Sequence, residues 1–92
     1  MPDQEFPLGV ARGGFHIFRT HGRFATSVNA ASVSGATRVF ASICEVDDND
    51  NPILGNADTR LYNVVPTFNR LTFRGEVLFG ADLNIRITWI IF

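Results

Sequence analysis

The chain has 92 residues, with eight basic and nine acidic side chains and a formal net charge of −1 at pH 7. This length corresponds to one small domain, which is only marginally stable by itself. The single cysteine, Cys44, excludes a disulfide within the chain, and its apolar context FASICEV predicts an inert, buried thiol. All the basic residues are arginines scattered along the sequence, so no nucleic-acid partner is expected.

The N-terminal stretch MPDQEFPLGV has no basic region followed by an apolar segment, so a signal peptide is not expected. Apolar runs are far shorter than the ~20 residues of a membrane helix, so no membrane insertion is expected. The sequence predicts a soluble protein and leaves its compartment open: cytoplasmic, virion-associated or exported by another route. Without disulfides or a zinc cluster, oligomerisation is the remaining source of extra stability.

Short runs of Phe, Val, Ile and Thr, separated by Gly, Asn, Asp and Pro, predict an all-β fold. Residues 1–13 contain two prolines and two glycines and are interpreted as an extended arm, which leaves 14–92 as a single domain. No segment keeps a helical period. Six strands at this spacing predict an antiparallel β-sandwich. The expected strands are 15–19, 23–31, 38–46, 59–65, 70–79 and 83–92.

The last two expected strands can be paired as a hairpin across Gly80-Ala81-Asp82. This register puts all the large apolar residues of both strands on one face and a polar group on the other. The polar group consists of Arg74, Glu76, Asn84 and Arg86. Gly75 then makes room for a bulky neighbour or a bulge. Ile90 and Phe92 fall on the polar side, and we expect them to contact other copies of the chain. The alternatives are that the N-terminal arm covers them or that they are ordinary exposed apolar residues.

The acidic stretch DDNDN, residues 47–51, places oxygen ligands at alternate positions, as calcium loops do. Pro52 replaces the glycine of an EF-hand loop, and Asp58 stands where its glutamate belongs. A solvated turn is therefore favoured over a calcium site, and no cofactor is expected. His16, His21 and the serines lack the context of a metal or catalytic site, so an enzyme is not predicted.

Two segments, RLYNVVPTFNRLTF (60–73) and ITWIIF (87–92), resemble the H-type lectins, the family of snail agglutinin and the discoidin C-terminal domain. RVFASI (38–43) and EVDDND (45–50) precede them in the family's order. The resemblance implies a six-stranded antiparallel β-sandwich that assembles as a parallel trimer. It also implies binding of galactose or N-acetylgalactosamine near the subunit boundaries.

The sugar-contact residues of that family are not matched. Its arginine position falls near Asn56, its aromatic-histidine pair near Val77 and Leu78, and its tyrosine near Asp82 or Leu83. Charged and amide side chains near an aromatic surface remain suited to sugar hydroxyls, with Tyr62 and Phe68 as the aromatic candidates. The candidate ligand-binding residues are Asn56, Asp58, Arg74, Glu76 and Asp82.

Two functions from different classes follow. One is a non-enzymatic, multivalent carbohydrate-binding homotrimer for glycans of the galactose and N-acetylgalactosamine class, in which several weak sites act together. The alternative is a structural or assembly trimer, such as the tip of a phage tail or fibre, without a sugar site. The missing sugar-contact residues favour the second hypothesis, and the polar group around Arg74 and Glu76 favours the first.

Overall fold

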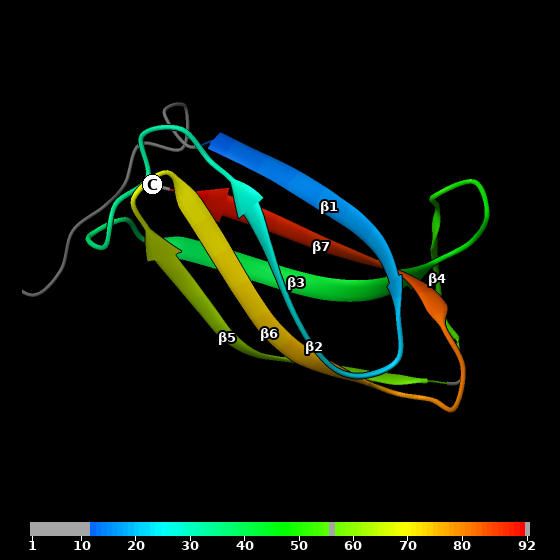
Figure 1. Cartoon of the computed structure of the whole chain (residues 1–92). Helices are drawn as coiled ribbons and strands as arrows, with labels where there is room; N and C mark the ends of the chain where they lie inside the picture. The colour runs from blue at the N-terminus through cyan, green and yellow to red at the C-terminus, as the bar shows by residue number, and fades with distance from the viewer. Residues whose placement is uncertain (1–11, 56, 92) are drawn as a thin grey trace, which may run out of the picture.

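The computed structural model describes residues 12–55 and 57–91, and it confirms the expected all-β character of the chain. The strands form two antiparallel sheets that lie face to face (Figure 1). Sheet A has the order β1-β7-β3-β4, and sheet B has the order β2-β6-β5. Among the described residues there is no helix that could cross a membrane. The strands are β1 (Arg12–Thr20), β2 (Gly22–Asn29), β3 (Val39–Val46), β4 (Pro52–Ile53), β5 (Asp58–Thr67), β6 (Arg70–Leu78) and β7 (Leu83–Ile91).

Several strand boundaries differ from the sequence-based expectation, most clearly in β1 and β5, and the short β4 is a seventh strand beside the six expected. β1 begins at Arg12, inside the expected arm of residues 1–13, whose first eleven residues lie outside the described part. β5 continues through Pro66 and Thr67, although the pattern ends this strand at Val65. Proline is tolerated there because β5 is the edge strand of sheet B, where one row of backbone N–H groups has no partner strand.

The hairpin expected between the last two long strands is not formed. β6 lies between β2 and β5 in sheet B, whereas β7 lies between β1 and β3 in sheet A. The segment 79–82 therefore crosses from one sheet to the other (Figure 1). The apolar sides of both strands still meet, because the strands pack across the core instead of side by side. Glu76 and Arg86, which that hairpin would place opposite each other, lie in different sheets.

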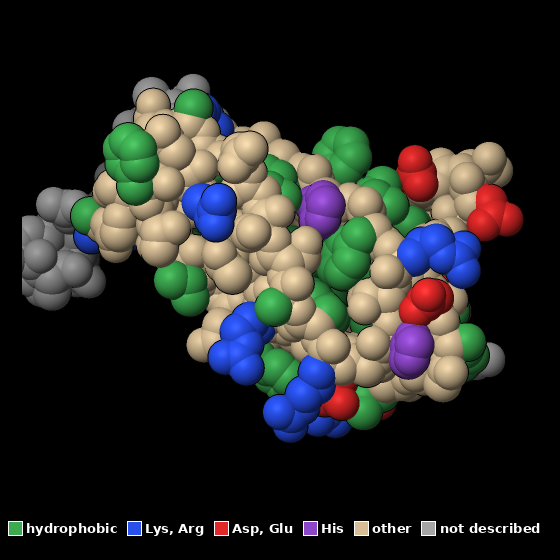
Figure 2. All heavy atoms as spheres, viewed as in Figure 1, with side chains coloured by type: hydrophobic (Ala, Val, Ile, Leu, Met, Phe, Trp, Pro, Cys, Tyr) green, Lys and Arg blue, Asp and Glu red, His purple; other side chains and the backbone are tan. Residues whose placement is uncertain are grey.

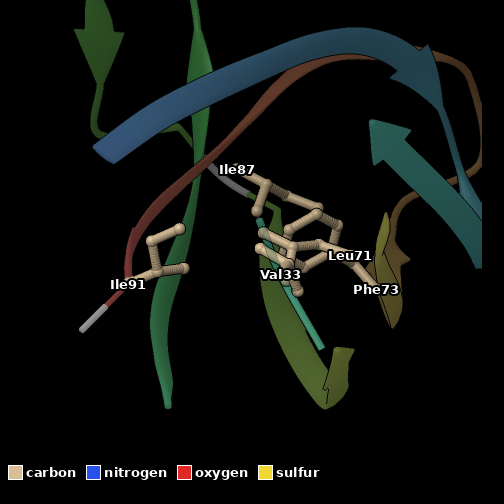
Figure 3. Packing of buried hydrophobic residues seen from close by; sticks show 5 residues of the cluster. All are labelled: Val33, Leu71, Phe73, Ile87 and Ile91. Carbon is tan, nitrogen blue, oxygen red and sulfur yellow. The ribbon is translucent and has the colours of Figure 1, made fainter. Parts of the chain in front are cut away.

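The core lies between β6 and β7, and its side chains point toward one another from both sheets (Figure 3). Phe73 is fully buried, and its ring centroid lies 5.8 Å from that of Trp89 in the opposite sheet. Burying each such side chain contributes about 1.5–3 kcal/mol to folding. The cluster of buried residues consists of Val33, Leu71, Phe73, Ile87 and Ile91.

The turn between β5 and β6 depends on Asn69, whose φ of 56° lies in the left-handed region. Its side-chain oxygen accepts the backbone N–H of Ser32 at 3.1 Å. Its own backbone N–H donates to the carbonyl oxygen of Val33 at 2.9 Å. Asn69 therefore ties this turn to the β2–β3 connection, which carries the buried Val33.

Replacing Asn69 by alanine is expected to destabilise the fold by about 2–3 kcal/mol. About 1 kcal/mol comes from the lost hydrogen bond, and about 1–2 kcal/mol comes from placing a Cβ-bearing residue without a polar side chain at positive φ. Asn69→Gly loses only the hydrogen bond, and Asn69→Asp keeps both features. Urea unfolding should therefore rank the variants Asp, Gly, Ala in falling stability. Equal stability of the Gly and Ala variants would contradict a strained turn.

Candidate ligand-binding face

The outer surfaces of the two sheets differ in chemistry because side chains alternate along each strand. In sheet B the inward residues of β2, β5 and β6 are mostly apolar, and the outward ones are mostly charged or polar. We call this outward surface the basic face. It contains Arg23 from β2, Arg70, Arg74 and Glu76 from β6, and Asp58, Arg60, Tyr62 and Asn63 from β5.

Strand register sets the charged residues of the basic face in rows. Arg23 and Arg60 lie directly opposite Glu76 from its two sides. In the next row Arg74 lies opposite Asn63, and Arg70 lies two rows further along β6. Figure 2 shows arginine side chains gathered along the lower margin of the molecule, where β2 and β6 run in Figure 1.

A bulge in β5 shapes the middle of the basic face. The register passes from Leu61↔Gly75 to Asn63↔Arg74, so Tyr62 is an extra residue in the edge strand. Tyr62 and Asn63 are consequently both exposed, although they are neighbours in a strand. The Tyr62 hydroxyl donates a hydrogen bond to Oε1 of Glu76. Bulges often re-aim side chains at binding sites, and this one sets an aromatic ring beside a carboxylate and two arginines.

The structure brings three of the five predicted site residues onto one surface. Arg74 and Glu76 lie on the basic face, and Asp58 lies at its end, opposite Leu78. Asp82 is elsewhere, in the β6–β7 loop, where its Oδ1 lies 2.5 Å from Nδ1 of His21. Asn56 lies outside the described residues. Arg74 and Glu76 therefore remain together at the centre of the candidate site, whereas Asp82 lies apart from it.

The expected grouping of Arg74 and Glu76 with Asn84 and Arg86 is wrong. Asn84 and Arg86 belong to β7 and face outward from sheet A, because the hairpin on which the grouping depended is not formed. Of the two aromatic candidates, Tyr62 reaches the centre of the basic face. Phe68 lies in the β5–β6 turn and is 83% exposed, at the far end beyond Arg70.

Arg23 and Arg60 join the site without having been predicted. Alternation places both outward, since each precedes an inward residue, Phe24 and Leu61. Alternation along each strand can be read from the sequence, but it does not indicate which strands are neighbours in the sheet. Only the position of β6 between β2 and β5 sets both arginines next to Glu76.

The outer surface of sheet A carries a group of large apolar side chains in addition to its polar residues. We call this group the apolar face; it consists of Phe15, Ile17, Phe40 and Ile90. Phe15 is 64% exposed, Phe40 69% and Ile90 45%. A shallow hollow of about 190 Å³ lies between Phe40 and Ile90. Cys44 is half-buried on the same side, opposite Arg86, and not in the core as expected.

Arg86 lies in the middle of sheet A, between Ile17 of β1 and Cys44 of β3. Its Nε atom is buried and has no hydrogen-bond partner among the described residues. A buried donor without a partner is costly, at about 1–3 kcal/mol.

A second hollow, of about 230 Å³, opens between the start of β1 and the end of β2. Trp89 and Asn29 line it together with Arg12. The Arg12 guanidinium donates a hydrogen bond to the carbonyl oxygen of Ala31, and the Trp89 ring packs against Phe73 in the core. These polar and aromatic groups thus serve to close the end of the two sheets.

The acidic stretch 47–51 forms a turn held by its own first residue. Oδ1 of Asp47 accepts the backbone N–H groups of Asn49 at 2.8 Å and Asn51 at 3.0 Å. Among the described residues no group of three or more His, Cys, Asp or Glu side chains is placed to hold a metal ion.

His16 stacks on Phe18 and lies 3.2 Å from the Thr26 hydroxyl, which links the edges of the two sheets.

Compared with protein-family models, with curated proteins and with solved structures, the chain shows no match. What its surfaces can bind therefore follows from their own side chains.

Proposed function

We propose that this chain is a non-enzymatic carbohydrate-binding module with an H-type-lectin-like β-sandwich, which acts as a multivalent homotrimer. Its ligands are glycans of the galactose and N-acetylgalactosamine class. The binding site is the centre of the basic face, around Tyr62, Arg74 and Glu76. The observation that carries the proposal is the Tyr62–Glu76 hydrogen bond on an exposed bulge flanked by arginines.

The chemistry of this centre suits a sugar. Glu76 offers carboxylate oxygens that accept hydrogen bonds from hydroxyl groups, and Arg74 and Arg60 offer N–H donors. Asn63 both donates and accepts, opposite Arg74. The Tyr62 ring is 47% exposed, so it provides an apolar surface against which the C–H side of a pyranose can rest. The Tyr62–Glu76 bond holds both groups in place before a ligand arrives.

The arrangement of the two outer surfaces supports multivalent action. The apolar face and the basic face belong to different sheets and point in opposite directions. Association of three chains through their apolar faces would turn every basic face outward. Weak sites on one rigid assembly gain avidity by orders of magnitude without new contacts. The resemblance of the 60–73 and 87–92 segments to H-type lectins adds the expected trimer and sugar class.

Replacing Arg74 or Glu76 by alanine is expected to weaken glycan binding at least about tenfold, because each side chain supplies a charge-assisted hydrogen bond. The measurement is a glycan array with the labelled protein, followed by titration of the best galactose-containing ligand. Light scattering should show unchanged assembly. The matched control is Arg19→Ala, which removes an exposed arginine from β1 of sheet A and should leave binding intact.

A blank array with folded protein, or unchanged binding by both variants, would place the function elsewhere. The alternative is then the structural or assembly trimer, as in a phage tail or fibre tip without a sugar site. One observation favours this alternative independently of any ligand: large apolar side chains, among them Phe15 and Phe40, are exposed on sheet A. The trimer is common to both hypotheses, so the glycan measurement separates them.

A further inference from the structure

We propose that the basic face selects acidic glycans, in which galactose or N-acetylgalactosamine units carry or alternate with carboxylate or sulfate groups. The inference rests on the proposed carbohydrate-binding function and names the class of ligand for the same face. It is carried by the distribution of arginines over sheet B, which the order of residues along the chain does not show.

Half of the chain's eight arginines lie on this one surface: Arg23, Arg60, Arg70 and Arg74. The carboxylates on the same surface are Glu76 and Asp58, so the basic face has a formal charge of +2. The whole chain carries −1, which leaves −3 for the rest. Acidic side chains gather at another end, near the β3–β4 connection at the right of Figure 2. Half of the arginines, which look evenly scattered in the sequence, thus share one face of the folded chain.

The spacing of the arginines fits an extended ligand with repeated charges. Arg23 and Arg60 are two strand spacings apart, or about 10 Å, and Arg70 and Arg74 are about 14 Å apart along β6. A single small anion cannot reach guanidinium groups so distributed. A linear chain lying along β6 would meet Arg70, Arg74 and the Arg23–Arg60 pair in succession. Guanidinium groups bind carboxylate and sulfate oxygens with two parallel hydrogen bonds.

Glu76 and Tyr62 distinguish an acidic glycan from a nucleic acid. A carboxylate between Arg23 and Arg60 repels a continuous polyphosphate backbone, but it accepts hydrogen bonds from sugar hydroxyls. Proteins that bind single-stranded nucleic acids use several stacking aromatic rings along a basic groove. On this face Tyr62 is the aromatic residue among the arginines, and its hydroxyl is engaged with Glu76. A ligand with both hydroxyls and separated anionic groups matches this mixture.

The test compares four probes on the intact protein: chondroitin sulfate, polygalacturonate, a neutral galactan, and a single-stranded oligonucleotide of similar charge. We expect at least one acidic polysaccharide to bind more than about tenfold tighter than the galactan, and to lose affinity as salt is raised. Arg23→Gln and Arg70→Gln should each weaken that binding at least about tenfold, as expected for loss of a charge-assisted hydrogen bond. The matched control, Arg19→Gln on sheet A, should change it less than about twofold.

Four outcomes would overturn the inference. If the neutral galactan binds as tightly as the acidic chains and salt has no effect, the carbohydrate-binding function stands and the preference for acidic ligands falls. If Arg19→Gln weakens binding as much as Arg70→Gln, the attraction is a general effect of charge and not of this face. If the oligonucleotide alone binds, or no probe binds to folded protein, both the inference and the proposed function are wrong.

Discussion

Replacing Gly75 by alanine is expected to destabilise the protein by about 3 kcal/mol or more. A Cβ at this position would lie 2.3 Å from the carbonyl oxygen of Arg60 and 2.7 Å from the Phe24 ring. Overpacking costs about 1–3 kcal/mol when side chains can shift, and a backbone oxygen in a paired strand cannot. For a domain of this size the melting temperature should fall by about 12 °C or more.

The control for this prediction is Gly35→Ala, in the β2–β3 connection. No heavy atom lies within 4 Å of a Cβ built there, so stability should change by no more than about 0.5 kcal/mol. A second variant separates the two clashes: Phe24→Leu in the Gly75→Ala background should recover part of the loss, since the clash with the Arg60 carbonyl remains. Equal melting temperatures for Gly75→Ala and Gly35→Ala would contradict the packing of β2 and β5 around β6.

Replacing both Phe15 and Ile90 by serine is expected to convert the proposed trimer into single chains. These residues lie on the apolar face, exposed by 64% and 45%, and their burial against other copies is the attraction that holds the assembly. Losing two such contacts weakens association by about 4 kcal/mol, or roughly a thousandfold. Light scattering at several protein concentrations measures the change in mass. Phe92, which the sequence also assigns to this contact, lies outside the described residues.

A matched control replaces an exposed aromatic residue that is not on sheet A. Phe68→Ser, in the β5–β6 turn, removes a side chain that is 83% exposed and should leave the mass of the assembly unchanged. If Phe68→Ser dissociates the protein and the Phe15/Ile90 double variant does not, the contact is at the end of sheet B. A wild-type protein of monomer mass would remove the trimer from both proposed functions, and with it the assembly that the lectin resemblance implies.

Gly75 illustrates how much of the packing can be predicted from the sequence pattern. Its alternation with Phe73 and Val77 indicates a glycine on the inward side of a strand, and therefore a bulky neighbour or a bulge. Both are present: Phe24 is the neighbour, and the bulge lies beside Gly75 in β5. The pattern identifies the need for space and not the residue that occupies it.

The all-β character, the six longer strands and the inward side of each could be predicted from the sequence, because a period of two residues is a local property of the chain. The sequence could not decide which strands pair. A hairpin and a crossing between sheets bury the same residues of β6 and β7, and backbone hydrogen bonds do not distinguish one partner strand from another. Packing across the core made that choice, as Phe73 against Trp89 illustrates.

The candidate site was likewise predictable only in part from the sequence. Arg74 and Glu76 could be assigned to one surface from alternation within a single strand. Asn84 and Arg86 could not, because their place depended on the pairing of two strands. The tertiary structure alone gathered Arg23 and the β5 bulge around Glu76, since residues some fifty positions apart in sequence meet only when β2, β6 and β5 form one sheet. Surface charge is a property of that assembled sheet, and the order of residues along the chain does not reveal it.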